Sequence, residues 1–531
     1  MRRIYTYLLT IILLLSACSI YAQSVIKEQT KIILPDEKDT YWWSGVINHA
    51  HRMPIQNGYS IDLYGNNYGN QIQPLVLSSD GRIIWSEHPF RLSYHQDSLT
   101  VTAREGKIKY SKSGNTLQSA FSYASSRYFP PNGKTPHIAL FEAPQYNTWI
   151  ELMYDQNQKD VLEYATNIIK NGFPPGVIMI DDNWQKDYGV WEFKPDKFPS
   201  PKKLVDSLHN MGFQVMLWVC PFVSPDSRVY RKLRDEGLLL KNKNNRVAIK
   251  RWWNGASAVL DFTNPLAKDW YHEQLEELMK KYNIDGYKFD GGDTQYYTDV
   301  MTHEQVTPNQ HTQLFGEIGL QYPLNEFRAM WKMGGKHLVQ RLRDKEHNWK
   351  DLQKLIPGII IEGLMGYPFT CPDMIGGGGF KSFMNADILD QELIVRSTQC
   401  HALMPMMQFS AAPWRVLDEK HLEACKEAVK IRQEHKNLII SLAKKAAETG
   451  EPIVRSMAYV FPDKGYDTIQ DQFMLGDDLM VAPIVENNKR SRKVQVPEGM
   501  WKSSAGETFK GPKTISMQVA LDELPYFKKL K

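Results

Sequence analysis

The sequence predicts an α/β protein built on a (β/α)8 TIM barrel, with an N-terminal β-sandwich and a small C-terminal β-domain. Its 531 residues are too many for one compact core, so two or three domains are expected. In the middle of the chain, over residues 143–447, continuous apolar runs alternate with helical patterns. Such runs are typical of parallel strands that helices cover on both faces. Polar clusters at the ends of these runs favour a closed barrel over an open sheet.

The first 22 residues are predicted to be an export signal peptide. Arg2 and Arg3 precede an apolar run, residues 8–15, that is too short to span a bilayer. Two kinds of processing stay open: cleavage after Ala22, which we favour, and lipidation of Cys18. Either kind places the mature protein outside the cytoplasm, in the periplasm or as an outer-membrane lipoprotein.

Residues 23–142 show short alternating strands separated by Gly, Asn and Asp, for example residues 59–64 and 99–103. This pattern predicts an antiparallel sandwich. The strand pattern returns near the end of the chain, for example in residues 478–483. A small C-terminal β-domain is therefore expected over residues 448–531.

In the predicted barrel, strands and helices follow one another in a regular order. The apolar runs expected to be strands are residues 148–153, 176–180, 214–219, 286–289, 338–341 and 358–364. The helices are expected over residues 159–171, 202–211, 268–281 and 419–434. Because the carboxyl ends of the strands build the active site of such a barrel, polar residues that follow these runs are the candidates for function.

The composition gives no indication of a nucleic-acid partner. The 64 basic and 60 acidic side chains leave a net charge of +4, and no long Lys/Arg run is present. The 14 Trp and 26 Tyr residues either fill the cores of large β-domains or stack on the faces of sugars, two readings of about equal weight.

The cysteines show no metal-site spacing, and neither a metal nor an organic cofactor is expected. Export would permit a disulfide, but buried free thiols are the favoured prediction. Besides Cys18, the cysteines are Cys220, Cys371, Cys400 and Cys425.

Several acidic and aromatic side chains cluster at the predicted strand ends. In chain order, the candidates are Asp181, Asp182, Trp184, Trp218, Trp253, Lys288, Asp290, Asp293, Arg341, Asp344 and Asp373. One such carboxylate could simply cap a helix, but several of them interleaved with tryptophans suit glycosidic-bond cleavage better. That reaction needs one carboxylate to attack or stabilise the sugar carbon and a second, partly protonated one to donate to the leaving oxygen. Lys288 would keep the nearby carboxylate of Asp290 ionised.

Blocks of sequence spread over most of the chain carry a resemblance to a known family. They are residues 260–265 with Trp270, and residues 284–290, 356–366, 372–377, 471–476 and 496–501. Together they resemble the motifs of glycoside hydrolase family 31. The resemblance implies a retaining mechanism that passes through a covalent glycosyl-enzyme.

The resemblance also implies roles for individual residues. Asp290 corresponds to the nucleophile, and Asp344, which precedes Trp349, corresponds to the acid/base. Asp181 matches the position that binds hydroxyls at the non-reducing end of the sugar. The chain departs from the family before the acid/base, because residues 341–343 replace its usual Trp-Ser/Thr-Gly. The residues that stay open as rival acid/base candidates are Asp293, Glu326 and Asp373.

Two further departures concern the substrate. Residues 291–293 replace the common Met-Asn-Glu, and a family His near the end of the barrel is replaced around residues 408–410. Residues 288–290, 366–369 and 372–377 look more like the family branch that includes myogenesis-regulating glycosidase and bacterial α-galactosidases. Residues 181–185 also resemble the Asp-Asp-Gly-Trp of other α-galactosidase families. The sequence therefore predicts a retaining, exo-acting α-glycosidase with a carbohydrate substrate, α-galactosides being favoured. The alternatives are an α-glucosidase, an α-xylosidase, an α-N-acetylgalactosaminidase or an inactive carbohydrate-binding homologue.

Overall fold

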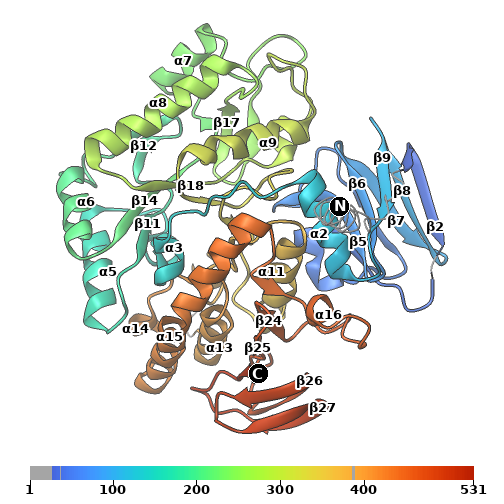
Figure 1. The fold of residues 1–531 in the computed structure, drawn as a ribbon. Coiled ribbons are helices and arrows are strands. Elements are labelled where there is room, and N and C mark those ends of the chain that lie inside the picture. Colours follow the sequence, from blue (N-terminus) through green and yellow to red (C-terminus); the bar gives the residue numbers. More distant parts are fainter. Residues whose placement is uncertain (1–26, 36, 385–388, 531) are drawn as a thin grey trace, which may run out of the picture.

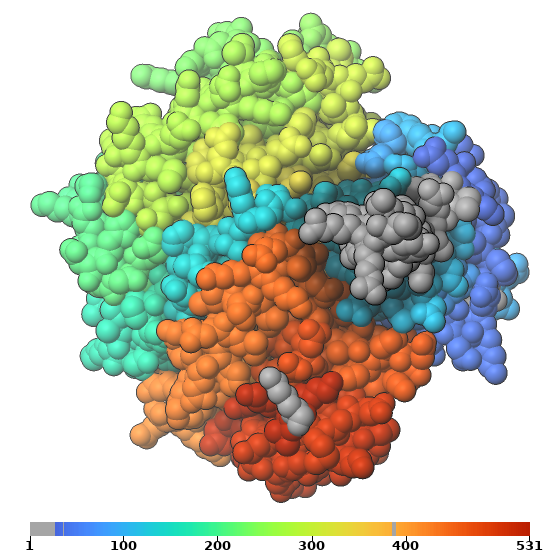
Figure 2. Space-filling model, viewed as in Figure 1, coloured from blue at the N-terminus to red at the C-terminus, as the bar shows by residue number. Residues whose placement is uncertain are grey.

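The computed structural model describes residues 27–35, 37–384 and 389–530. They form three parts, with the N-terminal strands (blue) on one side of the barrel and the C-terminal strands (red) below it (Figure 1). In the space-filling view, the yellow segment of the barrel adjoins the blue N-terminal part, and the orange segment adjoins the red C-terminal part (Figure 2). The predicted signal peptide and Cys18 lie outside the described residues.

The N-terminal part consists of two antiparallel sheets. One sheet has the strand order β1 (Lys27–Gln29), β9 (Ile108–Lys112), β6 (Arg82–Ser86), β5 (Ile72–Ser78) and β3 (Trp42–Val46). The other has the order β2 (Lys31–Pro35), β8 (Ser98–Ala103), β7 (Phe90–His95) and β4 (Tyr59–Asp62). Along β8, Leu99 and Val101 are buried whereas their neighbours are partly exposed, so the apolar alternation marks the inner face. The predicted sandwich is confirmed.

Two helices follow the last sandwich strand, where only strands were expected. Helix α2 (Leu117–Tyr128) starts at a capping box in which Thr116 and Ser119 satisfy each other's backbone N–H groups. Its last residue, Tyr128, stacks on Trp85 of β6 with ring centroids 5.0 Å apart. Helix α3 (Ala139–Glu142) comes next. The sandwich strands therefore end well before residue 142, because this capping signal starts a helix that covers the sheet.

Eight parallel strands form the barrel. In spatial order they are β10 (Gln145–Asn147), β11 (Val177–Ile180), β14 (Gln214–Val219), β18 (Gly286–Phe289), β19 (Leu324–Phe327), β20 (Gln340–Arg341), β21 (Thr370–Cys371) and β22 (Gln408–Phe409). Strand β22 pairs with β10, and a bridge from Met374 to Gln408 closes the ring just beyond β21. The predicted TIM barrel is confirmed.

Helices surround the barrel in the alternating order that the sequence indicates. The main ones are α5 (Gln158–Lys170), α6 (Pro201–Asn210), α8 (Pro265–Tyr282), α9 (Pro308–Ile318), α11 (Leu355–Leu364), α13 (Gln391–Ala402) and α15 (Glu419–Thr449). Helix α8 shows the signals that set its ends. Asn264 caps its first turn ahead of Pro265, and Asn283 ends it in the left-handed conformation.

Two of the predicted barrel strands are wrong. Strand β10 ends at Asn147, and residues 148–153 instead contain helix α4 (Trp149–Leu152). Residues 358–364 belong to α11, all ten residues of which are buried. A helix that is buried on every side lacks a polar face, so its sequence does not differ from that of a buried strand. Conversely, β19 was not predicted, because polar Asn325 and Glu326 interrupt its apolar pattern.

The C-terminal part is a six-stranded sheet, which confirms the predicted β-domain. Its strand order is β23 (Val454–Arg455), β24 (Phe473–Leu475), β25 (Leu479–Val481), β28 (Tyr526–Leu530), β26 (Ser491–Ser503) and β27 (Thr508–Gln518). All of its pairings are antiparallel. Trp501 and Phe527 lie at the centre of a separate apolar core.

Among the described residues, none of the helices has the length and hydropathy that a membrane span requires. Cys220, Cys371, Cys400 and Cys425 are buried and unbridged, as predicted.

Candidate active site

A cavity of about 700 Å³ opens at the carboxyl ends of the barrel strands. Strands β18 and β20 and the loops after β11, β18, β19, β20 and β21 supply its charged residues, and the N-terminal part closes one side. The lining residues are Asn48, Asn66, Tyr68, Gly69, Trp149, Tyr154, Asp181, Asp182, Trp218, Trp253, Lys288, Asp290, Asp293, Gln295, Tyr296, Arg328, Arg341, Arg343, Asp344, Met374, Phe380 and Lys381. It combines carboxylates, cations and aromatic rings, which is the composition of a site for a polar organic substrate.

Asp290 follows β18 directly and is 9% exposed within the cavity. Its Oδ1 accepts hydrogen bonds from Arg328 Nε at 2.9 Å and from the Gly291 N–H at 2.8 Å. Its Oδ2 accepts a single hydrogen bond, from the Trp218 indole at 3.2 Å. Burial alone would raise the pKa of Asp290, but the charges of Arg328, Lys288 and Arg341 hold it well below its ordinary value. These cations therefore favour the ionised carboxylate of Asp290.

The chain turns sharply after Asp290, and two glycines make the turn possible. Gly291 has a φ of 75°, and a Cβ on it would lie 2.6 Å from the Phe222 ring. A Cβ on Gly292 would lie 2.1 Å from the ring of Phe315. Neither position can therefore hold a side chain unless one of these rings moves.

The turn places Asp293 against Arg328, which holds two carboxylates at once. Arg328 Nη2 lies 2.6 Å from Asp293 Oδ2, and Nη1 lies 3.0 Å from Asp293 Oδ1. Both oxygens of Asp293 are therefore occupied, and its carboxylate serves to orient Arg328. Arg328 Nη1 also donates to the Gly69 carbonyl at 2.9 Å, which ties the N-terminal part to the cavity.

The floor of the cavity contains a buried ion pair and a second carboxyl group. Lys288 Nζ donates to Asp181 Oδ2 at 2.5 Å, and both side chains are about 95% buried. Asp182 accepts hydrogen bonds from Tyr188 and Asn254 on one oxygen and from Gln185 and its neighbour's backbone on the other. Burial raises the pKa of Asp182 to about 7. The floor thus offers donors and acceptors to sugar hydroxyls without a large net charge.

Asp344 lies at the mouth of the cavity, and its side chain is 44% exposed. Its Oδ1 accepts a hydrogen bond from Arg341 Nη1 at 2.7 Å. The same nitrogen lies 2.6 Å from Oδ1 of Asp373. Asp373 is fully buried, and its Oδ2 accepts the Lys345 N–H at 2.7 Å, so it positions the loop that carries Asp344.

Glu326 lies inside the barrel, below the cavity. It is fully buried, accepts a hydrogen bond from Gln408 at 2.7 Å and forms an ion pair with Arg341 at 3.2 Å. Glu326 and Asp373 do not line the cavity, and Asp293 is held by Arg328. Among the cavity carboxylates, Asp344 is the one with free access to solvent.

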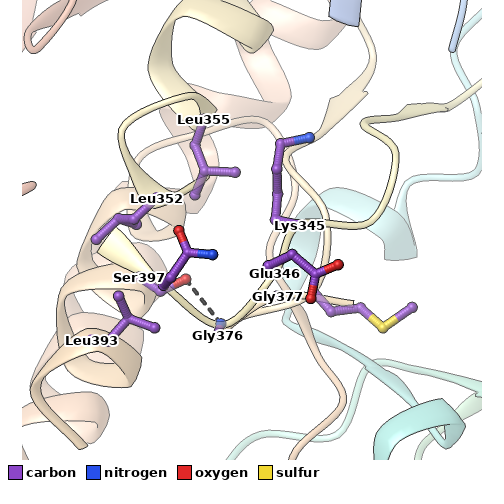
Figure 3. Close-up of a pocket in the computed structure, with 10 residues that line it drawn as sticks. Lys345, Glu346, Leu352, Leu355, Gly376, Gly377, Leu393 and Ser397 are labelled. Atoms are coloured by element: carbon purple, nitrogen blue, oxygen red, sulfur yellow. Dashed lines mark hydrogen bonds between the residues drawn. The ribbon is translucent and has the colours of Figure 1, made fainter. Parts of the chain in front are cut away.

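A second loop packs behind the Asp344 loop and leaves only a small void, of about 10 Å³ (Figure 3). The Gly376 N–H donates to Ser397 Oγ of α13 at 3.0 Å, the contact that is dashed in the figure. Gly377 has a φ of 102°, and a Cβ there would lie 2.5 Å from the Lys345 carbonyl oxygen. The position of Asp344 therefore depends on glycine in the neighbouring loop.

Aromatic rings form the outer wall of the cavity. Trp149, Tyr154 and Phe380 pack edge to face, with centroid distances of 5.4 to 6.0 Å. The Trp253 ring, which also lines the cavity, is 48% exposed, and the Arg328 guanidinium lies 5.5 Å from its centroid. Exposed flat rings at a polar cavity are suited to stacking on the C–H faces of sugars.

Most of the residues predicted from the sequence do line this cavity. They are Asp181, Asp182, Trp218, Trp253, Lys288, Asp290, Asp293, Arg341 and Asp344. Trp184 and Asp373 do not. The Trp184 ring is fully buried against Phe193 and donates its N–H to the Trp218 carbonyl, so it supports the floor and cannot contact a substrate directly.

The sequence reasoning missed several lining residues. Arg328 follows β19, a strand that was not recognised, and Trp149 was placed inside a predicted strand. Asn66, Tyr68 and Gly69 come from a different domain, and no sequence signal indicates their contact with the barrel. One signal was present in the sequence. Arg328 directly follows Leu324–Phe327, a segment that could have been recognised as a missing barrel strand.

A TIM barrel whose cavity holds carboxylates at the strand ends and is walled by aromatic rings is typical of a glycoside hydrolase. The family 31 model for the TIM-barrel domain matches residues 140–439, and that for the C-terminal domain matches residues 450–530. The chain belongs to glycoside hydrolase family 31.

Known proteins of this family resemble the chain over most of its length. It is 34% identical to the myogenesis-regulating glycosidase of Mus musculus over 92% of the chain and 74% of the mouse protein. It is 24% identical to alpha-xylosidase XylQ of Lactiplantibacillus pentosus over 87% of the chain, but spans only 63% of XylQ. A family 31 dextranase of Flavobacterium johnsoniae, solved with glucose, has the same fold, with a TM-score of 0.82 at 19% identity over 96% of the chain and 67% of the dextranase.

Proposed function

We propose that the chain is a retaining, exo-acting α-glycosidase in which Asp290 is the nucleophile and Asp344 is the general acid and base. The observation that carries the proposal is the state of Asp290, a carboxylate that three cations keep ionised at the centre of the cavity. An attacking carboxylate has to be ionised before it can bond to the anomeric carbon. Asp344, at the mouth, lies where the leaving part of the substrate would exit.

The hydrogen bonds of Asp290 select the oxygen that attacks. Oδ1 accepts two hydrogen bonds, from Arg328 and Gly291, whereas Oδ2 accepts only the longer one from Trp218. Oδ2 would therefore attack the anomeric carbon while Asp344 donates a proton to the glycosidic oxygen, and the leaving group departs. Asp344 would then take a proton from water, whose oxygen attacks the same carbon and releases the sugar with its configuration retained.

The floor residues suit the terminal sugar of the substrate. Asp181, Asp182 and Lys288 would bind its hydroxyl groups in the closed inner end of the cavity, which supports exo-cleavage. We favour an α-galactoside, because the segment from Asp181 to Trp184 resembles the Asp-Asp-Gly-Trp of other α-galactosidases. The names of the relatives include an α-xylosidase and a dextranase, so α-xylosides and α-glucosides are the alternatives, with N-acetyl-α-galactosaminides.

A panel of aryl α-glycosides tests the function. We expect release of 4-nitrophenol from the α-galactoside to exceed that from the α-glucoside, α-xyloside and N-acetyl-α-galactosaminide. The first sugar product, followed by NMR, should have the α configuration. Preferential cleavage of another glycoside would overturn the choice of sugar, and a β product would overturn the retaining mechanism.

The location of the protein is a separate proposal. The leader predicted over residues 1–22 supports export to the periplasm or attachment to the outer membrane through Cys18. Fractionation of cells that express the full chain, with a Cys18→Ala variant for comparison, distinguishes the two locations.

A further inference from the structure

Some of the charged side chains that line the cavity form ion pairs, and others do not. They comprise five acids and five bases, counting Asp290 and Asp344 among the acids. Lys288 is paired with Asp181, and Arg328 with Asp290 and Asp293. Arg341 is paired with Asp344 and with Asp373 behind the cavity wall. The two bases that remain are Arg343 and Lys381.

Neither Arg343 nor Lys381 forms an ion pair or a side-chain hydrogen bond with any residue that the structure describes. Both are exposed and both line the cavity. The Arg343 guanidinium lies close to the Gly69 backbone, because a Cβ on Gly69 would be 3.3 Å from Nη1. The Arg343 N–H also donates to Asn70 Oδ1 at 3.0 Å, so the N-terminal part fixes the base of this side chain at the mouth of the cavity.

Arg343 and Lys381 belong to the two segments that carry or contact Asp344. Arg343 precedes Asp344 in the chain, in the segment where the family's usual Trp-Ser/Thr-Gly is absent. Lys381 begins helix α12 (Lys381–Met384), which follows a glycine loop, residues 376–379. In that loop, a Cβ on Gly378 would lie 3.0 Å from Asp344 Oδ1. Two segments that meet at the proposed acid/base therefore each contribute one free cation to the cavity lining.

This position assigns them to the leaving group of the substrate. The floor of the cavity holds the terminal sugar, and Asp344 protonates the oxygen that joins it to the next unit. Groups around Asp344 consequently face that next unit. A neutral sugar would leave both cations without a partner, whereas an anionic one would form charge-assisted hydrogen bonds with them. The guanidinium of Arg343 also has the fork geometry that suits carboxylate or sulfate oxygens.

We propose that the enzyme cleaves α-glycosides whose leaving group is an anionic sugar, a uronic acid or a sulfated sugar, held by Arg343 and Lys381. This inference rests on the proposed function and defines its substrate class. The shared chemistry is a negative charge on the unit next to the scissile bond. Since the cations are exposed, salt should weaken their effect.

Matched disaccharides test the inference. Each carries the terminal sugar that the aryl panel identifies. In the first pair this sugar is linked to glucuronate or to neutral glucuronamide, and in the second pair to glucose 6-sulfate or to glucose. We expect kcat/KM for at least one anionic substrate to exceed that of its neutral match by roughly tenfold to a hundredfold at low salt. The ratio should fall towards one at about 1 M salt. A preference for glucuronate over glucuronamide identifies the anion as a carboxylate, and a preference for glucose 6-sulfate over glucose identifies it as a sulfate.

Variants separate binding of the anion from a structural role. Arg343→Gln and Lys381→Gln should each lower the ratio of anionic to neutral kcat/KM, and the double variant should bring it close to one. Lys350→Gln, an exposed lysine outside the cavity, should leave the ratio unchanged. A wild-type ratio near one in both pairs overturns the inference while aryl glycoside cleavage keeps the proposed function. No cleavage of any aryl glycoside overturns both.

Discussion

The guanidinium of Arg328 joins Asp290 and Asp293 in one buried cluster. Its Nε lies 2.9 Å from Oδ1 of Asp290, and its Nη2 lies 2.6 Å from Oδ2 of Asp293. One cation thus keeps Asp290 ionised and fixes its plane, while Asp293 fixes the cation. Two other cations act on Asp290. Lys288 is held by Asp181, and Arg341 is held by Asp344, Asp373 and Glu326.

Replacing Asp290 by Asn should abolish turnover and leave the fold intact. The amide cannot form the glycosyl ester, so kcat should fall by roughly 10⁴-fold or more. Circular dichroism and the melting temperature check that the variant is folded. As a further check, Asp290→Gly with azide should yield a β-glycosyl azide, since azide would attack from the face that Asp290 occupies. Activity close to wild type in Asp290→Asn would show that another group is the nucleophile.

The pH profile of the enzyme should depend on Arg328. Asp290 has to be ionised in the free enzyme, and the Arg328 charge lowers the pKa of Asp290. Arg328→Gln removes that charge, so the pKa of Asp290 rises and the acid limb of kcat/KM moves to higher pH, by roughly 1 to 3 units. Arg328→Lys keeps the charge and should shift the limb less. An acid limb that stays in place in Arg328→Gln would contradict this account.

The sequence predicts a site residue only where the barrel strand before that residue has a clear apolar pattern. Asp181, Lys288 and Asp290 follow β11 and β18, whose apolar runs are unambiguous, and they do meet in the cavity. Arg328 escaped prediction because β19 carries Asn325 and Glu326 into the barrel interior, which breaks the apolar pattern.

Other parts of the site depend on packing over long distances in the chain. The Gly69 carbonyl accepts a hydrogen bond from Arg328, 259 residues later, and no local pattern encodes that contact. Trp184, in contrast, was predicted to line the site but does not. It follows a barrel strand as a sugar-binding residue would, but its ring turns into the apolar core beside Phe193.

Asp344→Asn should distinguish the proposed acid/base from its rivals. An acid catalyst matters most when the leaving group is a poor one, so kcat/KM for a disaccharide should fall by roughly 10² to 10⁴-fold. For a dinitrophenyl glycoside, which needs no protonation, the same variant should lose far less. Equal losses on the two substrates would instead assign Asp344 to binding. Glu326→Gln is the matched comparison, since Glu326 is buried below the cavity and should not show this dependence on the leaving group.

Asp182 should make the stability of the protein depend on pH. Burial raises the pKa of Asp182 from 3.8 to about 7, so the folded protein keeps a proton that the unfolded chain loses. Stability from this group is therefore present at low pH and is lost as the pH rises from about 4 to 7, by up to about 4 kcal/mol. Asp182→Asn has no proton to lose, so its free energy of unfolding relative to wild type should increase over that interval. Denaturation at pH 4, 6 and 8 measures this, with exposed Asp196→Asn as the control. A difference that is the same at every pH would contradict the buried, protonatable state of Asp182.

Gly377→Ala should damage catalysis through the loop that carries Asp344. The new Cβ would lie 2.5 Å from the Lys345 carbonyl oxygen, and a φ of 102° is strained for alanine. The backbone on either side of Lys345 would have to move, and Asp344 is the adjacent residue. We expect kcat for a disaccharide to fall by roughly 10²-fold, since small misplacements of a catalytic group have effects of that size. Dinitrophenyl glycosides should be affected less, as in Asp344→Asn. Gly172→Ala, at another positive φ but with no atom within 4 Å of the new Cβ, controls for backbone strain alone. If the two glycine variants lose the same activity, the contact with Lys345 does not position Asp344.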